Sequence, residues 1–142
     1  MKKNALWSII ALVLVSGIVV TLRIQRSAVE AVEHSCLVSI EQVLYETSQT
    51  GKLKLESPSK SKFAIVSKSD QDKVFRLLKE QSALLDCSSK ARSKNDISVD
   101  VWGRKIEIFA RQSSNGDTLF KVSSKGVDGI SGTLDDIHDY AK

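Results

Sequence analysis

The sequence predicts an α+β fold in which one long N-terminal helix and a second helix precede a small antiparallel sheet near the C-terminus. Three features of the sequence predict it. An uncharged apolar run is followed by apolar residues at steps of three and four, which is the spacing of one helix face. From Asp100 onward the spacing changes to two, as in a strand with one buried face. An Asn-Gly pair then indicates a hairpin turn.

The apolar run, residues 5–22, contains no charged side chain and follows Lys2 and Lys3. Its length is at the lower end of what a helix needs to cross a bilayer. A cleaved signal peptide shares the basic start and the apolar run, but this run is longer than a usual signal core and no small-x-small site follows it. The sequence favours an uncleaved anchor at 5–22 behind a basic N-terminus at 1–4, with that terminus in the cytoplasm.

The positive charge of the chain flanks this apolar run. The net charge is +4, and four of the 21 basic residues precede residue 27, which leaves 17 to balance the 17 acidic residues. A neutral body with basic residues beside an apolar segment is typical of a membrane protein. The charge distribution therefore argues for a membrane and against a nucleic-acid partner.

The segment Arg26–Thr47 has the pattern of an amphipathic helix. Its apolar face is formed by Val29, Val32, Cys36, Ile40, Val43 and Thr47. No proline or glycine lies between Thr21 and Thr50, so the anchor is predicted to continue into this segment as one helix that Gly51 ends.

The polar residues of this helix are expected to face solvent. Glu30, Glu33 and Glu41 are placed on a solvated face, and His34 is placed on the surface and not in a ligand site.

The chain contains only two cysteines, Cys36 and Cys87. An even count is compatible with one disulfide in an oxidising compartment, and equally with two buried free thiols. Their spacing fits no zinc site.

A second helix is predicted from Ser69, as its N-cap, to about Asp86. Phe63–Val66 is expected to form a short strand or a buried connector, and Ser88–Asn95 a loop. The buried face of the helix is expected to hold Val74, Leu77, Leu78, Leu84 and Leu85.

The predicted hairpin begins with alternating residues, of which Ile106, Ile108 and Ala110 face one side. Ser113–Asp117 contains the Asn-Gly pair and is the predicted turn. Leu119–Ser123 is the predicted return strand, and its inward residues are Phe120 and Val122.

The stretch that follows the hairpin, Ser124–Ile137, holds three glycines and three aspartates between Gly126 and Asp136. Glycine permits sharp turns, and aspartate supplies the hard oxygen ligands that Ca²⁺ requires. An ordinary surface turn has a similar composition, and the spacing is not that of an EF-hand. From composition alone, a calcium loop and a surface turn both remain open.

Two residue patterns resemble the G-type major pseudopilin of type II secretion systems. Asp100-Val101-Trp102-Gly103 is similar to the family's Asp-Pro-Trp-Gly before its first strand. Ser124–Ile137 is similar to its calcium loop, Ser-x-Gly-x-Asp-Gly-x-x-Gly followed by Asp-Asp-Ile. The similarity of residues covers about 99–137, and the layout of the remaining elements also fits.

The resemblance implies a pseudopilin-like domain at 23–142, with its hairpin and calcium loop at 99–137. It implies a structural Ca²⁺ held by the side chains of Asp128, Asp135 and Asp136 and by the backbone carbonyl of Lys125.

The resemblance also implies a location and partners. The chain would be a single-pass inner-membrane protein with a periplasmic domain, and its partners would be the membrane, other pseudopilins or secretion-machinery proteins, and further copies of itself. Trp102 is expected to be a core anchor.

The N-terminus departs from the family. Residues 1–7 contain neither the leader glycine nor the Phe-Thr-Leu-Ile-Glu start of the family, and no acidic residue precedes Glu30. The prepilin peptidase is therefore not expected to process this chain. The alternative to a filament subunit or accessory is a stand-alone, membrane-anchored extracytoplasmic interaction module.

No catalytic residues are predicted. His34 and His138 lie far apart and accompany no serine or cysteine pattern of a nucleophilic triad. No glycine-rich phosphate loop precedes a helix. The chain is expected not to be an enzyme.

Overall fold

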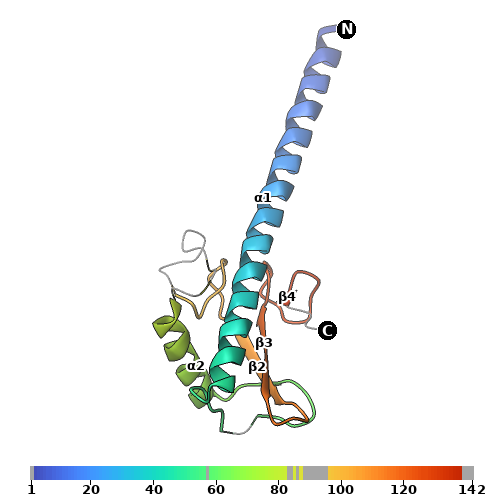
Figure 1. Ribbon diagram of the computed structural model, residues 1–142. Helices are drawn as coiled ribbons and strands as arrows, with labels where there is room; N and C mark the ends of the chain where they lie inside the picture. Colours follow the sequence, from blue (N-terminus) through green and yellow to red (C-terminus); the bar gives the residue numbers. More distant parts are fainter. Residues whose placement is uncertain (1, 57, 83–84, 86, 88–95, 139–142) are drawn as a thin grey trace. The chain divides into compact units, whose positions relative to one another are not determined.

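The computed structural model of the protein describes residues 2–56, 58–82, 85, 87 and 96–138. The chain divides into two compact units, residues 1–31 and 32–142, and the division falls within the first helix, α1. Within the second unit, α2 and the strands β2 and β3 lie on different sides of the C-terminal part of α1 (Figure 1).

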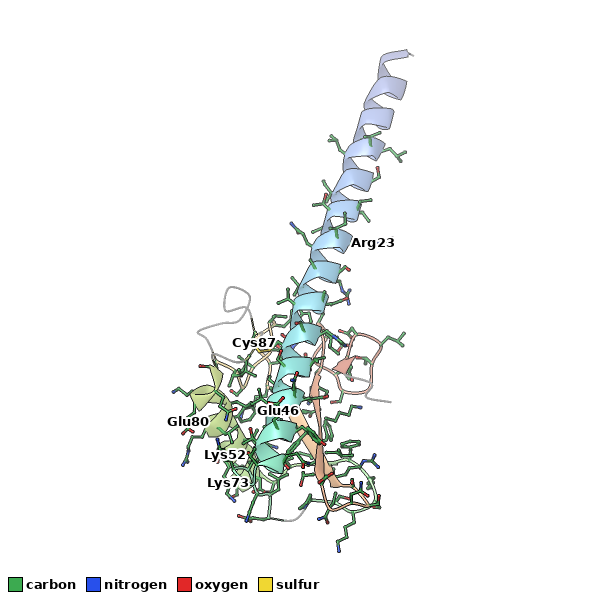
Figure 2. All side chains as sticks on the ribbon, in the orientation of Figure 1. Arg23, Glu46, Lys52, Lys73, Glu80 and Cys87 are labelled. Atoms are coloured by element: carbon green, nitrogen blue, oxygen red, sulfur yellow. A yellow bond between two sulfur atoms is a disulfide. The ribbon has the colours of Figure 1, made fainter. Side chains whose placement is uncertain are left out.

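The predicted single helix is confirmed, since α1 runs without interruption over Lys2–Gln49. It ends next to Gly51, whose φ of 71° is readily adopted only by glycine. In residues 11–24 the large apolar side chains stand exposed around the helix (Figure 2). This helix is long and apolar enough to cross a membrane.

The buried face of α1 in the second unit begins later than predicted. Cys36, Ile40, Val43 and Thr47 are buried as expected, whereas Val32 is 37% exposed. The buried residue in that turn of the helix is Glu33.

The prediction that Glu33 faces solvent is wrong, and Glu41 is half-buried instead of fully exposed. The Glu33 side chain is fully buried, and its carboxylate accepts a hydrogen bond from the Val101 N–H at 3.2 Å. Glu41 accepts one from the Val122 N–H at 2.5 Å. A buried N–H without a partner is costly, so these two carboxylates satisfy backbone groups that α1 covers.

The helix α2 spans Lys68–Glu80. Its N-cap is Ser67, two residues before the predicted Ser69, because the chain leaves the sheet at Val66, whose N–H is bonded to the Ile108 carbonyl at 3.0 Å. The predicted end near Asp86 is also wrong, since the helix ends at Glu80.

The predicted buried face of α2 is confirmed at Val74 and Leu78, and Leu77 and Leu85 pack against the core. Leu84, Asp86 and the predicted loop at 88–95 lie outside the described residues.

The buried Asp70 ties the start of α2 to the preceding loop. Its carboxylate accepts hydrogen bonds from the Ser67 hydroxyl at 3.1 Å and the Glu56 N–H at 3.2 Å, and it pairs with Lys73 at 3.1 Å. Burial by itself would raise the pKa of Asp70. The bonds from Lys73, Glu56 and Ser67 outweigh burial, so the pKa of Asp70 lies below its ordinary value of 3.8.

The sheet has four antiparallel strands in the order β1-β2-β3-β4. The strands are β1 (Ala64–Ile65), β2 (Glu107–Gln112), β3 (Thr118–Ser124) and β4 (Ile137–His138). The predicted hairpin is confirmed as β2 and β3, with Ile108 opposite Val122 and Ala110 opposite Phe120. The α+β prediction is therefore confirmed, whereas β4 was not predicted.

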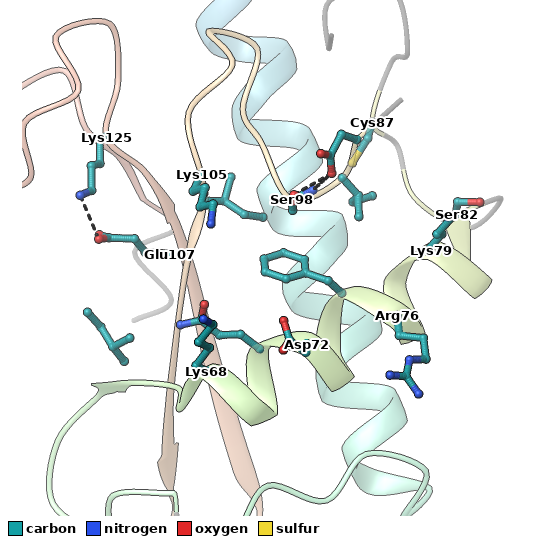
Figure 3. A pocket seen from close by; sticks show the side chains of 16 residues that line it. Lys68, Asp72, Arg76, Lys79, Ser82, Cys87, Ser98, Lys105, Glu107 and Lys125 are labelled. Atoms are coloured by element: carbon teal, nitrogen blue, oxygen red, sulfur yellow. Dashed lines mark hydrogen bonds and ion pairs between the residues drawn. The ribbon is translucent and has the colours of Figure 1, made fainter. Parts of the chain in front are cut away.

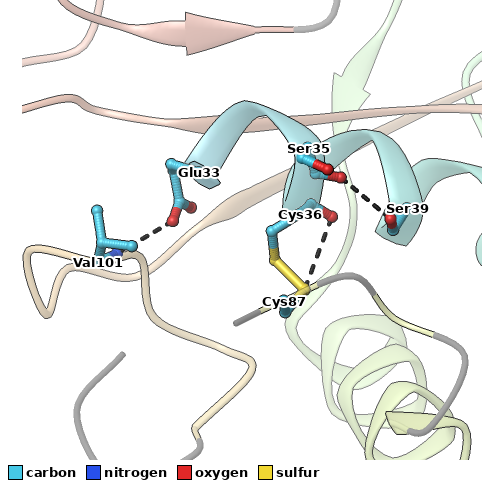
Figure 4. The surroundings of a disulfide bond; sticks show 6 residues. All are labelled: Glu33, Ser35, Cys36, Ser39, Cys87 and Val101. Atoms are coloured by element: carbon cyan, nitrogen blue, oxygen red, sulfur yellow. Dashed lines mark hydrogen bonds between the residues drawn. A yellow bond between two sulfur atoms is a disulfide. The ribbon is translucent and has the colours of Figure 1, made fainter. Parts of the chain in front are cut away.

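The core of the second unit joins α1, α2 and the sheet. Its fully buried apolar residues are Cys36, Leu37, Ile40, Leu44, Val74, Leu78, Ile108 and Val122. The structure pairs Cys36 with Cys87 in a disulfide, with an S–S distance of 2.03 Å (Figure 4). The bond links α1 to the segment that follows α2.

Candidate functional site

The acidic loop, residues 125–136, connects β3 to β4 and is closed at both ends by the sheet. Ser124 pairs with Ile137, so the first and last loop residues lie side by side. Gly126 has a φ of 62°, and a Cβ at this position would overlap the backbone carbonyl of Asp135. The loop can therefore close only with glycine at position 126.

Arg104 clamps the start of the acidic loop. Its guanidinium donates hydrogen bonds to the backbone carbonyls of Gly126 and Val127. A Cβ on Gly129 would lie 2.8 Å from the Arg104 Nε, so this glycine leaves room for the arginine. A planar guanidinium with several donors suits two neighbouring carbonyls.

Asp100 connects the two patterns that carry the family resemblance. This buried carboxylate accepts the N–H groups of Trp102 at 2.9 Å and Arg104 at 2.8 Å, and the Ser124 hydroxyl at 2.6 Å. It thereby holds the turn that carries Arg104 against the end of β3. The expectation that Trp102 anchors the core is wrong, because its side chain is only half-buried and lies outside the core cluster.

The three predicted carboxylates converge on the hydroxyl of Thr133. Its Oγ1 lies 3.4 Å from an oxygen of Asp128, 2.8 Å from one of Asp135 and 3.4 Å from one of Asp136. The structure thus brings together three residues that span nine positions in the sequence.

Each of these carboxylates also accepts a hydrogen bond from a backbone N–H of the loop. Asp128 accepts from Ile130 at 2.7 Å, Asp135 from Asp128 at 2.9 Å, and Asp136 from Gly132 at 2.6 Å. The backbone therefore fixes the orientation of all three side chains.

The pKa of Asp135 falls to about 2 in this setting. The main cause is the hydrogen bond from the Asp128 N–H, followed by the bond from the Thr133 hydroxyl, because both stabilise the ionised carboxylate. These hydrogen bonds stabilise the ionised form of Asp135 within the loop.

Lys125 and Glu107 hold the outer side of the loop. The Lys125 ammonium pairs with Glu107 on β2 at 3.2 Å, and the Ser131 hydroxyl donates to the same carboxylate at 3.2 Å. The backbone carbonyl of Lys125, the predicted fourth ligand, accepts the Gly129 N–H at 3.2 Å.

The chemistry of the loop suits Ca²⁺, since three carboxylates and one hydroxyl supply only hard oxygen atoms. The carboxylates, however, lie farther apart than the ligands of one bound ion. Among the described residues, no three His, Cys, Asp or Glu side chains lie close enough together to hold a metal ion. Calcium contacts its ligands at about 2.3–2.6 Å, so the three carboxylates would have to move inward around Thr133.

Sequence reasoning did not identify Arg104 or Thr133. Arg104 directly follows the Asp-x-Trp-Gly pattern, and Thr133 lies inside the predicted loop, so both were near a recognised signal. Their roles depend on contacts with residues that are not periodic neighbours, and residue type alone does not reveal such contacts.

No protein family, curated protein or solved structure matches this chain. The resemblance to the G-type pseudopilins therefore rests on the residues of the two sequence patterns and on the order of the elements.

Proposed function

We propose that the chain is a membrane-anchored, pseudopilin-like structural subunit or accessory of a type II secretion or pilus-type apparatus. Its second unit lies in the periplasm, and its acidic loop binds a structural Ca²⁺. The role is structural and not catalytic.

The observation that carries the proposal is the convergence of Asp128, Asp135 and Asp136 on one hydroxyl group. Three adjacent carboxylates repel each other, and a divalent cation is the simplest group that offsets this repulsion.

Two further observations agree with an anchored, extracytoplasmic protein. The apolar part of α1 is long enough to cross a bilayer. The disulfide between Cys36 and Cys87 suits an oxidising compartment such as the periplasm.

The bound ion would supply charge neutralisation and an additional link between the two ends of the loop. Asp128, Asp135, Asp136 and the Thr133 hydroxyl would hold it, while Arg104 fixes the start of the loop independently. At a calcium concentration of ten times the dissociation constant, binding would add about 1.4 kcal/mol to the free energy of unfolding.

Thermal unfolding of the full chain in dodecyl maltoside tests the proposal. We expect calcium to raise the Tm, a chelator to reverse the rise, and Asp128→Asn to abolish it. Asp117→Asn, in the hairpin turn, removes the same charge elsewhere and should keep the calcium response. If calcium does not shift the Tm of the unaltered chain, the calcium role is wrong.

A second candidate function is a stand-alone anchored interaction module. It is favoured by residues 1–7, which differ from the leader and helix start of the pseudopilin family. Crosslinking in the native membrane separates the two functions. Recovery of secretion-machine proteins supports the apparatus subunit, whereas their absence among the crosslinked neighbours favours the module.

A further inference from the structure

A groove lies between α2 and residues 96–107, and its volume is about 1350 Å³. This volume exceeds the roughly 300–1,000 Å³ of a typical small-molecule site. In Figure 3, Lys68, Asp72, Arg76 and Lys79 lie along one wall, and Lys105 and Glu107 lie on the other. All of these residues belong to the second unit.

The groove has an apolar floor. Phe75 and Ile97 are partly buried and pack against the core, and Ile106 is buried beneath them. Ile65, at the rim, is 58% exposed. Apolar surface in a concave site of this size is typical of a place where another molecule binds.

The rim of the groove carries an excess of positive charge. Within the described part of the chain, Lys68, Arg76, Lys79 and Lys105 make no ion pair or side-chain hydrogen bond. Other charges of the rim are engaged, because Lys125 pairs with Glu107 and Asp96 caps the turn at Ser98. Asp72 is the other acidic residue of the rim, so four cations stand against one carboxylate there.

We propose that this groove binds an acidic, extended peptide segment of a partner protein that also carries an apolar side chain. The cations attract the carboxylates of the segment, and the apolar side chain covers Phe75. This inference does not depend on the calcium loop.

The spacing of charges along α2 predicts a pattern for that segment. Lys68 and Arg76 are eight residues apart on one helix face, which is about 12 Å. An extended chain covers this distance in about four residues. Asp72 lies between the two cations and would repel a carboxylate at the middle of the bound segment. The best-fitting segment therefore has two acidic residues separated by three neutral residues, and the middle one of the three is apolar.

Two other occupants fit less well. A bilayer surface is flat and cannot enter a concave groove. A second copy of this chain would offer its acidic loop, but the carboxylates of Asp128, Asp135 and Asp136 all lie within 3.4 Å of the Thr133 hydroxyl. They are therefore too close together to face two cations about 12 Å apart.

Fluorescence anisotropy with the full chain in dodecyl maltoside tests the proposal. The probe is a fluorescein-labelled, C-terminally amidated peptide, Ser-Glu-Ser-Leu-Ser-Glu-Ser. The variant Lys68→Glu/Arg76→Glu should weaken binding by about tenfold or more, since each reversed charge now repels a carboxylate. Lys52→Glu/Lys54→Glu makes the same change of net charge outside the groove and should leave the affinity within about twofold.

Control peptides separate specific binding from general attraction between charges. Replacing leucine by serine, or placing the two glutamates side by side, should weaken binding. The proposal is overturned if the probe does not bind, if both double variants weaken it equally, or if the control peptides bind as tightly. It is also overturned if the chain self-associates through this groove, which would make a second copy the occupant.

Discussion

The β2–β3 hairpin and the acidic loop are neighbours in the chain, yet different interactions hold them. The hairpin buries Ile108, Ala110, Phe120 and Val122 against the helices in a regular two-residue alternation. The loop buries little and depends on Arg104 and on hydrogen bonds among its own polar groups. Apolar packing determines the first region, whereas specific polar contacts determine the second.

This difference separates stability from the proposed function. Changes in the packed region should lower the stability of the whole second unit, whereas changes in the loop should alter calcium binding and local opening with little global effect. The following predictions test that separation from the largest expected effect to the smallest.

Removal of the disulfide should have the largest effect on stability. Cys36 and Cys87 are 51 positions apart in the sequence, and the loss of a constraint on a loop of this length costs about 4 kcal/mol if chain entropy dominates. Urea unfolding of the full chain with and without reductant measures the change. A reduced protein as stable as the oxidised one would contradict a stabilising role for the bond.

Ile108→Ala should rank next. The side chain is fully buried in the sheet, and truncation of such a residue costs about 2–5 kcal/mol because it leaves a cavity. Ile130→Ala is the matched control, since Ile130 is exposed in the acidic loop and its loss should cost less than about 0.5 kcal/mol. If both variants lose the same free energy of unfolding in urea, the loop is packed as tightly as the hairpin and the prediction is wrong.

Asp70→Asn should lower stability by about 1–3 kcal/mol at neutral pH, because it removes charge-assisted bonds at a buried site. The folded-state pKa of Asp70 lies below 3.8, so its contribution is complete above that pH and is lost as the pH falls through the folded-state pKa. Urea midpoints between pH 6 and 2, compared with those of the variant, measure this. Parallel pH curves for the two proteins would contradict the prediction.

Arg104→Ala should have the smallest global effect and a clear local one. Loss of its bonds to Gly126 and Val127 should speed amide hydrogen exchange within residues 126–129 while the urea midpoint changes little. Lys105→Ala, at the next position, should leave loop exchange unchanged. A large drop in the urea midpoint of Arg104→Ala would contradict the prediction, because it would show that Arg104 contributes to the stability of the whole second unit.

The sequence predicted the parts of the molecule that follow a local period. The single helix α1, the inward residues of the hairpin and the turn at Gly116 were all predicted, because apolar spacing and turn chemistry are visible within a few neighbouring residues. That the three aspartates act together was an expectation from the family resemblance, since the composition of the loop also fits a surface turn.

The parts that were not predicted depend on contacts between distant segments. Glu33 reaches Val101 across 68 positions, and Arg104 reaches the carbonyl of Gly126 across 22. On a helical projection Glu33 lies on the same face as Cys36, Leu37 and Ile40, but its charge argued for solvent. Its burial follows from a backbone N–H that only the folded chain brings to it.

The most direct test of the central claim is a calcium titration of the ¹⁵N-labelled full chain in detergent, followed by NMR. We predict that the amides of residues 126–136 shift along one single-site curve, and that Asp128→Asn, Asp135→Asn and Asp136→Asn each weaken binding while Asp117→Asn does not. Loop amides that do not respond to calcium, or that respond equally in all four variants, would contradict the account.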